Sequence, residues 1–439
     1  MTPKHFETDA IRQQLDRTNY GEHSTPLFLT SSFVFEDAEH MRASFAEEND
    51  QNIYSRFSNP NTSEFIDKVV TMEGAEAGFA FASGMAAVFS TFAALLNSGD
   101  HIVSCQSVFG STHSLFTKFF PKWNIETSYF KVDQLETLES LIQPNTKVIY
   151  AESPTNPAVD ILDLEALGKI AKKHNLILII DNCFASPYLQ NPIKFGADLV
   201  IHSATKLMDG QGRVLGGITV GNAKLMHQIY LFSRNTGPAL SPFNAWVLSK
   251  SLETLGVRVD RHCKNALKVA KFLEKHPKVS VVKYPFLKSH PQYEIAKKQM
   301  RKGGNVVSFE IVGGIKAGQA FLNKIKLCSL SANLGDSRTI VTHPSSTTHS
   351  KLSEQDRLGI KPLAIQKHLQ LLPQVFKIDL PEALIKEVNT CSSNAQIRQV
   401  GVEWAIQQSK ELLDFGVPVL HYYSMGKSDN IKAIASQLF

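Results

Sequence analysis

A lysine, an aspartate and two hydroxyl residues stand at the ends of two apolar runs. The run 176–180 ends at Asp181, and a second run leads into Ser203-Ala-Thr205-Lys206. Both runs have the composition of buried parallel strands, whose carboxyl ends meet at the edge of an α/β sheet where ligands bind. Pyridoxal phosphate uses such a set of groups. The amine forms a Schiff base, the acid pairs with the pyridinium nitrogen, and the hydroxyls bind the phosphate.

Each of these residues also has an ordinary structural explanation. A lysine after a strand is commonly a solvated loop residue, and an aspartate there commonly caps a helix. A second feature favours the cofactor, because Ser83-Gly84-Met85 precedes a helical pattern at 86–96. Backbone N–H groups at the start of a helix bind phosphate, since they are unpaired and lie at the positive end of the helix dipole.

Six short motifs occur in an order that one enzyme family shares. Residues 15–360 resemble the Cys/Met-metabolism family of pyridoxal-phosphate enzymes, which includes the O-succinylhomoserine and O-acetylhomoserine sulfhydrylases and cystathionine γ-synthase. The resemblance implies an α/β fold of the fold-type I pyridoxal-phosphate transferase kind, with a mainly parallel sheet flanked by helices and a smaller α+β domain. The matching motifs are Tyr54-Ser-Arg56-Phe-Ser-Asn59-Pro60, Ser83-Gly84-Met85-Ala86, Glu152-Ser-Pro-Thr-Asn156-Pro157, Asp181-Asn182, Ser203-Ala-Thr205-Lys206 and Asn333-Leu-Gly335-Asp336.

The resemblance implies roles for individual residues. Lys206 is implied to be the catalytic residue, as both covalent anchor and general base. Tyr54 and Arg56 are implied to reach the cofactor phosphate of a neighbouring subunit, and hence a homodimer or homotetramer with shared active sites. Arginine suits that role because its planar fork binds phosphate bidentately. The implied cofactor-binding residues are Tyr54, Arg56, Ser83, Gly84, Met85, Phe109, Asn156, Asp181, Ser203, Thr205 and Lys206, and the implied substrate-binding residues are Asn333 and Leu334.

Phe109 narrows the implied chemistry. Many family members have at this position a tyrosine that stacks on the cofactor ring and can move protons. Phenylalanine keeps the stacking but has no hydroxyl, which resembles the sulfhydrylase branch more than the β-lyases. The implied reaction is a γ-replacement on an O-acylhomoserine, with O-succinylhomoserine as the preferred donor and sulfide as the acceptor. It gives homocysteine in methionine biosynthesis. The structural alternative is that Phe109 is a core aromatic.

Cystathionine γ-synthase or γ-lyase activity is an open alternative, with cysteine or cystathionine in place of sulfide. The sequence alone does not separate succinyl from acetyl or phospho donors. Comparing sulfide with cysteine as the acceptor distinguishes a sulfhydrylase from a cystathionine γ-synthase.

The family resemblance ends near Gly359. The family has there a strand whose arginine holds the substrate carboxylate, whereas this chain has no arginine between Arg357 and Arg398. No good substitute is evident, and Arg398 is a candidate only because it is the next arginine along the chain. Without the family's arginine, the protein would bind the substrate carboxylate more weakly. The third hypothesis is therefore a hybrid that binds the cofactor but is catalytically impaired.

The last eighty or so residues resemble a different family, the C-terminus of methylenetetrahydrofolate reductase. That family is a flavin-dependent (β/α)8 barrel, and this length supplies only a partial barrel-like tail, so neither flavin nor reductase activity is inferred. A natural fusion and an artificial join remain alternatives. The matching residues are Ile360-Lys361-Pro362, Leu372-Pro373, Pro381-Glu382-Ala-Leu384, Gly401-Val-Glu-Trp404 and Leu412-Leu413-Asp414-Phe415-Gly416-Val417-Pro418-Val-Leu420-His421-Tyr422-Tyr423.

Strand and helix patterns alternate from about residue 60 to 240, which predicts a mainly parallel sheet. The predicted strands there are 102–104, 147–151, 176–180 and 199–202, and the predicted helices are 86–96 and 163–174, the latter capped by Asp163. Further on, helices are predicted at 244–255, 260–275 and 317–324, and strands at 279–284, 306–312 and 340–342. The predicted domains are an N-terminal arm (1–58), a cofactor-binding domain (59–242), a truncated small domain (243–360) and the reductase-like tail (361–439).

The glycines after Lys206 are interpreted as a loop. Gly210, Gly212, Gly216 and Gly217 do not fit the dinucleotide fingerprint, because three residues separate the second and third glycines where the fingerprint has two.

Composition excludes several other classes. The 439 residues carry a net charge of only +5 without long charged runs, which does not indicate nucleic acid. Five widely spaced cysteines favour neither a disulfide framework nor zinc, and fit a reducing cytoplasm. His343 and His349 lack a third metal ligand nearby, so no metal is predicted. No apolar run is long enough for a membrane span. The expected partners are an amino-acid substrate and sulfide.

Overall fold

The structure is a computed structural model that describes residues 5–344, 359–360, 366, 369, 380–414, 421–422 and 429–438. The chain forms two compact units. Unit 1 comprises Met1–Val312 and Leu322–His349, and unit 2 comprises Gly313–Phe321 and Ser350–Phe439. All of the predicted cofactor- and substrate-binding residues belong to unit 1.

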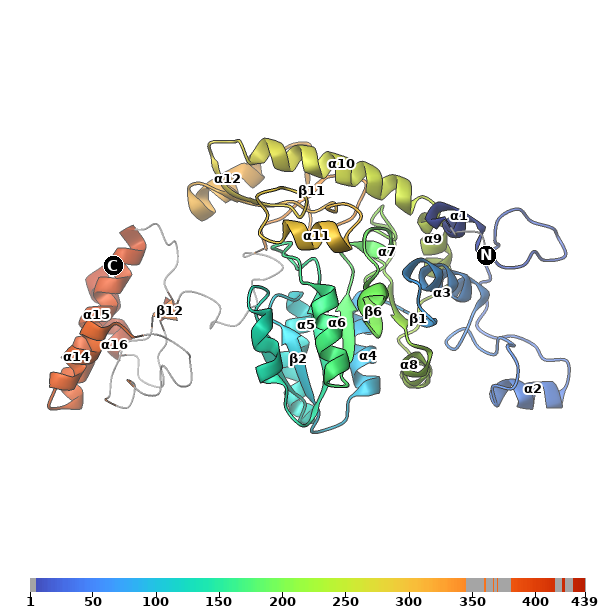
Figure 1. The fold of residues 1–439 in the computed structure, drawn as a ribbon, viewed down its shortest axis with the longest axis horizontal. Helices are drawn as coiled ribbons and strands as arrows, with labels where there is room; N and C mark the ends of the chain where they lie inside the picture. Colours follow the sequence, from blue (N-terminus) through green and yellow to red (C-terminus); the bar gives the residue numbers. More distant parts are fainter. Residues whose placement is uncertain are drawn as a thin grey trace. The chain divides into compact units, whose positions relative to one another are not determined.

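A seven-stranded sheet forms the centre of unit 1 (Figure 1). Its strands are β1 (Ala77–Phe81), β2 (His101–Cys105), β3 (Glu126–Phe130), β4 (Thr146–Glu152), β5 (Ile177–Asp181), β6 (Leu199–His202) and β7 (Gly217–Gly221). They lie in the order β1-β7-β6-β5-β4-β2-β3. Only β7 runs antiparallel to its neighbours, β1 and β6, and the other pairs in this sheet are parallel. The predicted α/β class with a mainly parallel sheet is confirmed.

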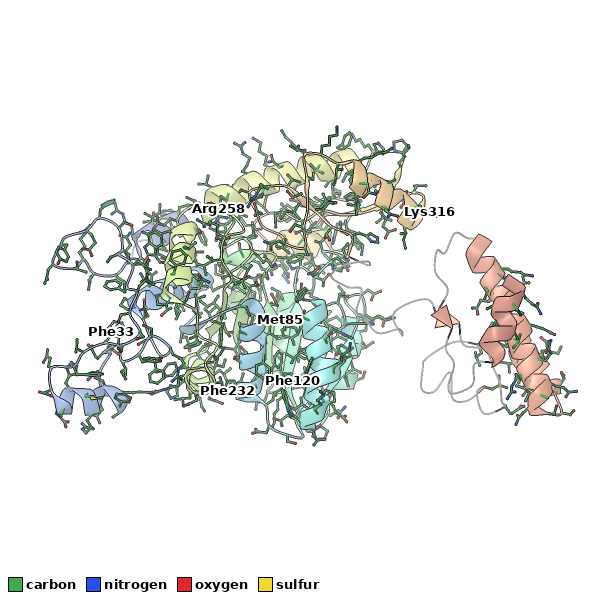
Figure 2. The ribbon with its side chains drawn as sticks, turned by 180° about the vertical axis from the view of Figure 1, so that it is seen from behind. Phe33, Met85, Phe120, Phe232, Arg258 and Lys316 are labelled. Atoms are coloured by element: carbon green, nitrogen blue, oxygen red, sulfur yellow. The ribbon has the colours of Figure 1, made fainter. Side chains whose placement is uncertain are left out.

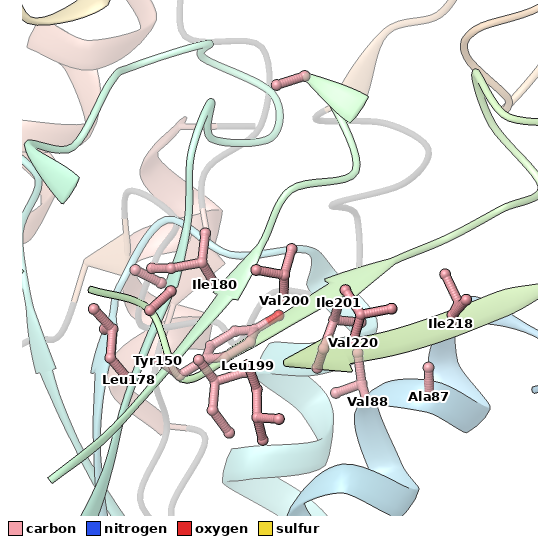
Figure 3. Packing of buried hydrophobic residues seen from close by; sticks show 14 of the residues in the cluster. Ala87, Val88, Tyr150, Leu178, Ile180, Leu199, Val200, Ile201, Ile218 and Val220 are labelled. Atoms are coloured by element: carbon pink, nitrogen blue, oxygen red, sulfur yellow. The ribbon is translucent and has the colours of Figure 1, made fainter. Parts of the chain in front are cut away.

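Helices between the strands pack on the sheet. Figure 3 shows Ala87 and Val88 beside Ile201, Ile218 and Val220 of β6 and β7. All five side chains are at most 2% exposed, so the contact removes their apolar surface from water. The helices are α3 (Pro60–Glu73), α4 (Gly84–Leu95), α5 (Gly110–Ser114), α6 (Leu164–Lys173), α7 (Ser186–Leu189) and α8 (Ala223–Thr236), with short turns η1 (Leu115–Phe119), η2 (Phe120–Trp123), η3 (Leu135–Leu141) and η4 (Pro192–Phe195).

The predicted elements of this half are confirmed. The strands predicted from sequence correspond to β2, β4, β5 and β6, and the two predicted helices to α4 and α6. Asp163 caps α6 as predicted, because its carboxylate accepts a hydrogen bond from the Ala166 N–H at 3.1 Å. The predicted glycine-rich loop is wrong at its end, because Gly217 is the first residue of β7. Glycines at both ends lower the strand propensity of this segment, whereas burial of all five residues stabilises it as a strand.

The remainder of unit 1 begins with two helices, α9 (Pro242–Leu252) and α10 (Leu255–Leu273). They confirm the two helices predicted there, with the break at Glu253–Thr254 rather than after residue 255. Strands predicted at 279–284, 306–312 and 340–342 are confirmed as β8, β9 and β11. The elements are β8 (Val279–Lys283), α11 (Tyr293–Gln299), β9 (Ser308–Ile311), β10 (Ser329–Leu330) and β11 (Ile340–Val341). The predicted domain boundaries stay predictions.

The N-terminal segment contains two short helices, α1 (Phe6–Arg12) and α2 (Ala38–Phe45). Figure 2 shows Phe33 in the loop that precedes α2. This segment exposes several large apolar side chains, with exposed fractions of 97% for Tyr20, 91% for Val34 and 41% for Tyr54. Clustered exposed apolar groups mark interaction surfaces. They are compatible with the predicted arm.

A buried ion pair fixes the start of this segment to α3. The Glu64 carboxylate accepts hydrogen bonds from the Leu15 N–H at 3.2 Å and from the Thr25 and Ser249 hydroxyls at 2.5 and 2.6 Å. It also lies 3.2 Å from the ammonium of Lys68, which is 0% exposed. Burial pushes the pKa of Glu64 upward, but the Ser249 and Thr25 hydrogen bonds and the Lys68 charge outweigh it, so the pKa lies below its ordinary value.

We expect Glu64→Ala to lower the free energy of unfolding by about 3 kcal/mol, because a buried charge loses its closest partner. Urea unfolding at neutral pH measures the loss. A carboxyl group with a lowered folded-state pKa stabilises the protein above its unfolded-state pKa, and the stabilisation disappears as pH falls through the folded-state pKa. The difference between wild type and variant therefore shrinks on acidification. An equal loss in Glu136→Ala, at an exposed position, would contradict this explanation.

Unit 2 contains three helices and a two-stranded pair in its described residues beyond residue 350: α14 (Glu382–Thr390), α15 (Asn394–Asp414), α16 (Asp429–Leu438), β12 (Gly359–Ile360) and β13 (His421–Tyr422). β12 and β13 are parallel. Leu384, Val388 and Ile397 form its buried apolar cluster. The predicted helix 317–324 is confirmed as α12 (Gly314–Lys324), whose residues divide between the two units. Across the described residues of both units, none of the helices combines the length and apolarity needed to cross a membrane.

Candidate active site

The two predicted strand ends lie next to each other. β5 and β6 are parallel neighbours, with Asp181 opposite Ile201. Asp181 therefore lies at the same sheet edge as the turn that carries Ser203 and Lys206. The backbone N–H of Lys206 donates to the Ser203 carbonyl at 3.2 Å, which keeps this turn tight. The structure thus brings together the amine, the carboxylate and the hydroxyl that the sequence singled out.

The Lys206 side chain is held by a distant segment. Its ammonium donates a hydrogen bond to the Asn333 side-chain oxygen at 2.7 Å. Gly335 packs against the Lys206–Leu207 peptide so closely that an added Cβ would lie 2.6 Å from the Leu207 nitrogen, and its φ is +78°. Only glycine fits this position. The predicted substrate-binding pair Asn333 and Leu334 therefore lies beside the catalytic candidate.

Arg258 holds the residues that follow Lys206 in the chain. This residue of α10, labelled in Figure 2, donates hydrogen bonds to the Leu207 and Met208 carbonyls at 2.8 and 3.4 Å and to the Ser251 carbonyl at 2.9 Å. Burial lowers its pKa. The sequence analysis missed Arg258, because nothing in a surface-like helical pattern marks an arginine that points inward.

Asp181 is partly accessible at the edge of the sheet but surrounded by protein groups. Its oxygens accept hydrogen bonds from the Cys183 N–H at 3.0 Å and, more weakly, from the Tyr150 hydroxyl at 3.4 Å. Burial raises the pKa of Asp181, while the Cys183 hydrogen bond and the charge of His202 oppose this rise. A carboxylate in such surroundings is stabilised by a nearby cation. A protonated pyridine nitrogen fits that requirement.

The start of α4 offers a phosphate site. Ser83 caps the helix by accepting a hydrogen bond from the Ala86 N–H at 3.1 Å. The next residue, Gly84, lies against Ser203, and an added Cβ would be 2.6 Å from the Ser203 Cβ. The start of α4 and the Ser203 hydroxyl thus lie close together, and such a pair of groups suits a phosphate.

Two further predicted residues, Met85 and Thr205, border this region. The Met85 sulfur accepts a hydrogen bond from the Thr112 hydroxyl at 3.8 Å, which agrees with a packing role for its side chain. The Thr205 hydroxyl donates to the Gly216 carbonyl at 3.2 Å and accepts from the Gly216 N–H at 3.1 Å. Thr205 therefore fixes the loop after the lysine in the structure described.

Phe109 and Asn156 are placed by two different strands of the sheet. Phe109 immediately precedes α5, after β2, and Asn156 follows β4. The residues predicted to surround the cofactor within the sheet domain share one property, an intermediate exposure that is neither buried nor fully accessible. They are Ser83, Gly84, Met85, Phe109, Asn156, Asp181, Ser203, Thr205 and Lys206, and Asn333 and Leu334 have the same exposure. This property fits residues that border a common site.

Tyr54 and Arg56 have different surroundings. The Arg56 guanidinium donates to the Arg234 carbonyl and lies 4.8 Å from the centre of the Phe57 ring. It also lies 5.5 Å from the centre of the Tyr54 ring. Arg56 thus contacts α8 in its own chain, and Tyr54 contacts its neighbours in the arm. Their predicted role toward a second subunit stays a prediction.

Parts of the predicted tail and its neighbourhood lie outside the described residues, including His349, Lys361 and Pro362. His343 lies within them. Arg398, the candidate replacement for the missing arginine, is exposed on α15 of unit 2.

Comparison with known proteins gives two family matches. The model of the Cys/Met metabolism PLP-dependent enzyme family matches residues 7–365, and the model of the methylenetetrahydrofolate reductase family matches residues 358–439. Both agree with the resemblances found in the sequence.

Individual relatives cover most of the chain. It is 45% identical to an O-succinylhomoserine sulfhydrylase of Pseudomonas aeruginosa, over 80% of this chain and 87% of the relative. It is 42% identical to an L-methionine gamma-lyase of Fusobacterium nucleatum, over 80% and 89%. A solved structure assigned as an O-acetylhomoserine (thiol)-lyase, from Campylobacter jejuni, contains N'-pyridoxyl-lysine-5'-monophosphate. It superposes with a TM-score of 0.77 at 34% identity, over 80% of this chain and 92% of that one. The fold-type I prediction is thereby confirmed.

Proposed function

Because the chain belongs to the family of Cys/Met metabolism PLP-dependent enzymes, we propose that it catalyses γ-replacement on an O-acylhomoserine. The proposed donor is O-succinylhomoserine, the acceptor is sulfide, and the product is homocysteine, as in methionine biosynthesis by trans-sulfuration enzymes. The supporting structural observation is the common sheet edge that carries the Lys206 amine, Asp181 and the start of α4. The similarity to a sulfhydrylase supports the choice of reaction.

Pyridoxal phosphate supplies, when bound, an electron sink for the electron pair left on Cα after proton loss. The residues present fit this cofactor. Lys206 anchors it and moves the Cα proton, which requires the mobile amine that Asn333 now holds at 2.7 Å. Asp181 pairs with the ring nitrogen. Phe109 covers one face of the ring.

The phosphate is held by the other half of the proposed site. Ser203 and the first-turn N–H groups of α4 bind its oxygens, and Thr205 keeps the intervening turn in place. Backbone donors are well suited to this task, because they are fixed by the helix and need no side-chain ordering. Asn333 and Leu334 are proposed to contact the amino-acid substrate.

The test uses the purified full-length chain loaded with pyridoxal phosphate. O-succinylhomoserine is supplied with sulfide, with cysteine, or alone, and homocysteine and cystathionine are assayed; methionine is tested as a sole substrate. Homocysteine formed only with sulfide supports the sulfhydrylase. Cystathionine formed with cysteine indicates a γ-synthase, and methanethiol released from methionine indicates a γ-lyase, the activity named for the Fusobacterium relative.

A second candidate rests on the sequence after Gly359. Since no arginine follows until Arg398, the chain lacks the family's arginine for the substrate carboxylate at the expected place. A charge-assisted contact of this kind contributes on the order of 1.5–3 kcal/mol. If the bound cofactor has its normal visible band and this band does not change when any of the substrates is added, the protein is a cofactor-binding hybrid that does not bind an amino acid.

We further propose a homodimer or homotetramer in which Tyr54 and Arg56 complete the site of a second subunit. The exposed apolar side chains of the arm support this, as does the partial exposure of Tyr54. Within the described part of the chain, the hydrogen bond recorded for the Arg56 guanidinium goes to a backbone carbonyl, and the group also lies over two aromatic rings. No carboxylate there neutralises its charge, which leaves the charge available for a phosphate.

We expect Arg56→Ala to weaken cofactor binding by about tenfold. At a cofactor concentration that loads wild type but not Arg56→Ala, mixing this variant with an inactive Lys206→Ala chain and allowing subunit exchange should give about a quarter of wild-type activity, because half of the dimers are mixed and each has one intact site. The rate of homocysteine formation measures the activity of the mixture. If the mixture is no more active than its components, each site is built from one chain.

A further inference from the structure

Glu152 is a buried carboxyl group at the end of β4 whose role the proposed reaction leaves open. It is 2% exposed and lies directly opposite Asp181 of the parallel neighbour β5. A carboxyl group is rarely buried unless its oxygens have hydrogen-bond partners. Its partners therefore indicate what it does.

Those partners are the backbones of two predicted cofactor-binding residues. The Glu152 Oε2 accepts a hydrogen bond from the Phe109 N–H at 2.8 Å. The Asn156 backbone N–H also lies close enough to lower the pKa of the Glu152 carboxyl group, against the rise caused by burial. Phe109 ends the loop after β2 and Asn156 lies in the loop after β4, so one side chain ties two loops to the end of β4.

The electrostatics of the site support a role toward the cofactor. Burial raises the pKa of Glu152 well above its ordinary value, and the charge of the adjacent Asp181 raises it further. Other groups that face this pair include Tyr150, which donates to Asp181, and His202, whose charge favours the Asp181 anion. The thiols of Cys105 and Cys183 also lie close, and both have raised pKa values because they are buried. Two neighbouring buried carboxyl groups do not both ionise readily. A neutral Glu152 leaves Asp181 as the anion available to the ring nitrogen.

We propose that Glu152 is a positioning residue of the cofactor site, whose side chain sets the Phe109 ring and the Asn156 amide against the pyridoxal ring through their backbone N–H groups. The inference rests on the proposed function only in that Phe109 and Asn156 face the cofactor. Glu152 itself touches neither the substrate nor the reacting atoms.

The test compares three variants in the full-length protein. Glu152→Leu keeps most of the volume but accepts no hydrogen bond, whereas Glu152→Gln retains an accepting oxygen without a charge. Asp198→Ala is the matched control. Asp198 accepts a backbone hydrogen bond from Leu178 N–H at 2.8 Å, but it precedes β6 at the opposite edge of the same sheet.

Three quantities are measured for each variant: the dissociation constant of pyridoxal phosphate added to apoprotein, the circular dichroism of the bound cofactor's visible band, and the melting temperature. We expect Glu152→Leu to weaken cofactor binding about tenfold and to reduce the visible dichroism, because the ring loses its fixed orientation. Glu152→Gln should restore both within about twofold. Asp198→Ala should lower the melting temperature without changing either cofactor signal.

Unchanged affinity and dichroism in Glu152→Leu would overturn the proposal, and so would equal changes in Asp198→Ala. If Glu152→Leu does not fold, Glu152→Ala replaces it, and the same comparison with Glu152→Gln decides. Failure of wild type to form homocysteine while it binds cofactor normally counts against the proposed reaction alone. The two inferences are therefore tested separately.

Discussion

Replacing Lys206 by alanine is expected to lower the rate of homocysteine formation by at least about a thousandfold, because the covalent anchor and the proton-transferring base are lost together. The steady-state rate with O-succinylhomoserine and sulfide measures the loss. Cofactor binding should persist without the covalent link, since Asp181 and the start of α4 remain. The Lys206 ammonium lies 2.7 Å from Asn333, so its removal disturbs a polar contact and leaves the sheet intact.

Lys169→Ala is the control, because this exposed lysine pairs with Glu165 on α6. It should keep its activity, as surface ion pairs contribute little. A small amine added to Lys206→Ala should return part of the lost rate if proton transfer is the main loss. Undiminished turnover in Lys206→Ala would end the assignment of this site.

The second large effect is expected from Asp181→Asn, with homocysteine formation reduced about a hundredfold. Asparagine keeps the size and the hydrogen bond from the Cys183 N–H, which is 3.0 Å in the wild type, but removes the negative charge. The ring nitrogen then loses the group that keeps it protonated. Turnover is compared with wild type at saturating cofactor.

Asp181→Asn should also lose a pH dependence of cofactor binding. Burial raises the pKa of Asp181 in the cofactor-free protein, so binding of a cationic ring nitrogen expels the proton from this carboxyl group. Wild-type affinity should therefore fall as the pH drops below this raised pKa. An Asn variant with the same pH profile and rate as wild type would assign the charge to another residue, of which Glu152 is the nearest.

The features that could be predicted from the sequence are those set by residues close together in the chain, namely the strand ends and the helix cap. An apolar run that ends in Asp181, and another that leads into Lys206, are enough to place both residues at one sheet edge, because parallel strands align their carboxyl ends. The cap of α6 by Asp163 was predictable for the same reason, since capping involves only neighbouring residues.

The residues that were missed act across long stretches of chain. Glu152 bonds Phe109, 43 residues away, and Arg258 bonds the Leu207 carbonyl, 51 residues away. Glu152 stands in a recognised motif and Phe109 was a predicted site residue, but no local pattern indicates that either hydrogen bond forms. The strand β7 was missed for a related reason, because tertiary burial overrides the low strand propensity of its glycines.

The position of Asn333 followed from family resemblance alone. Its loop has no periodicity, and its closeness to Lys206 is a property of the folded chain. Gly335 carries the clearest physical signal in that segment, since its positive φ and its close approach to the Lys206–Leu207 peptide exclude a side chain.

The hydrogen bond between Lys206 and Asn333 spans 127 residues of sequence. Closing so long a loop costs conformational entropy that only the contacts within it repay, and such contacts form late and slowly. During synthesis the sheet of unit 1 is complete before residue 333 has been made. The reactive amine thus reaches its final place only after the chain through residue 335 has closed onto the sheet. We therefore expect covalent capture of the cofactor to follow the folding of unit 1 through residue 335.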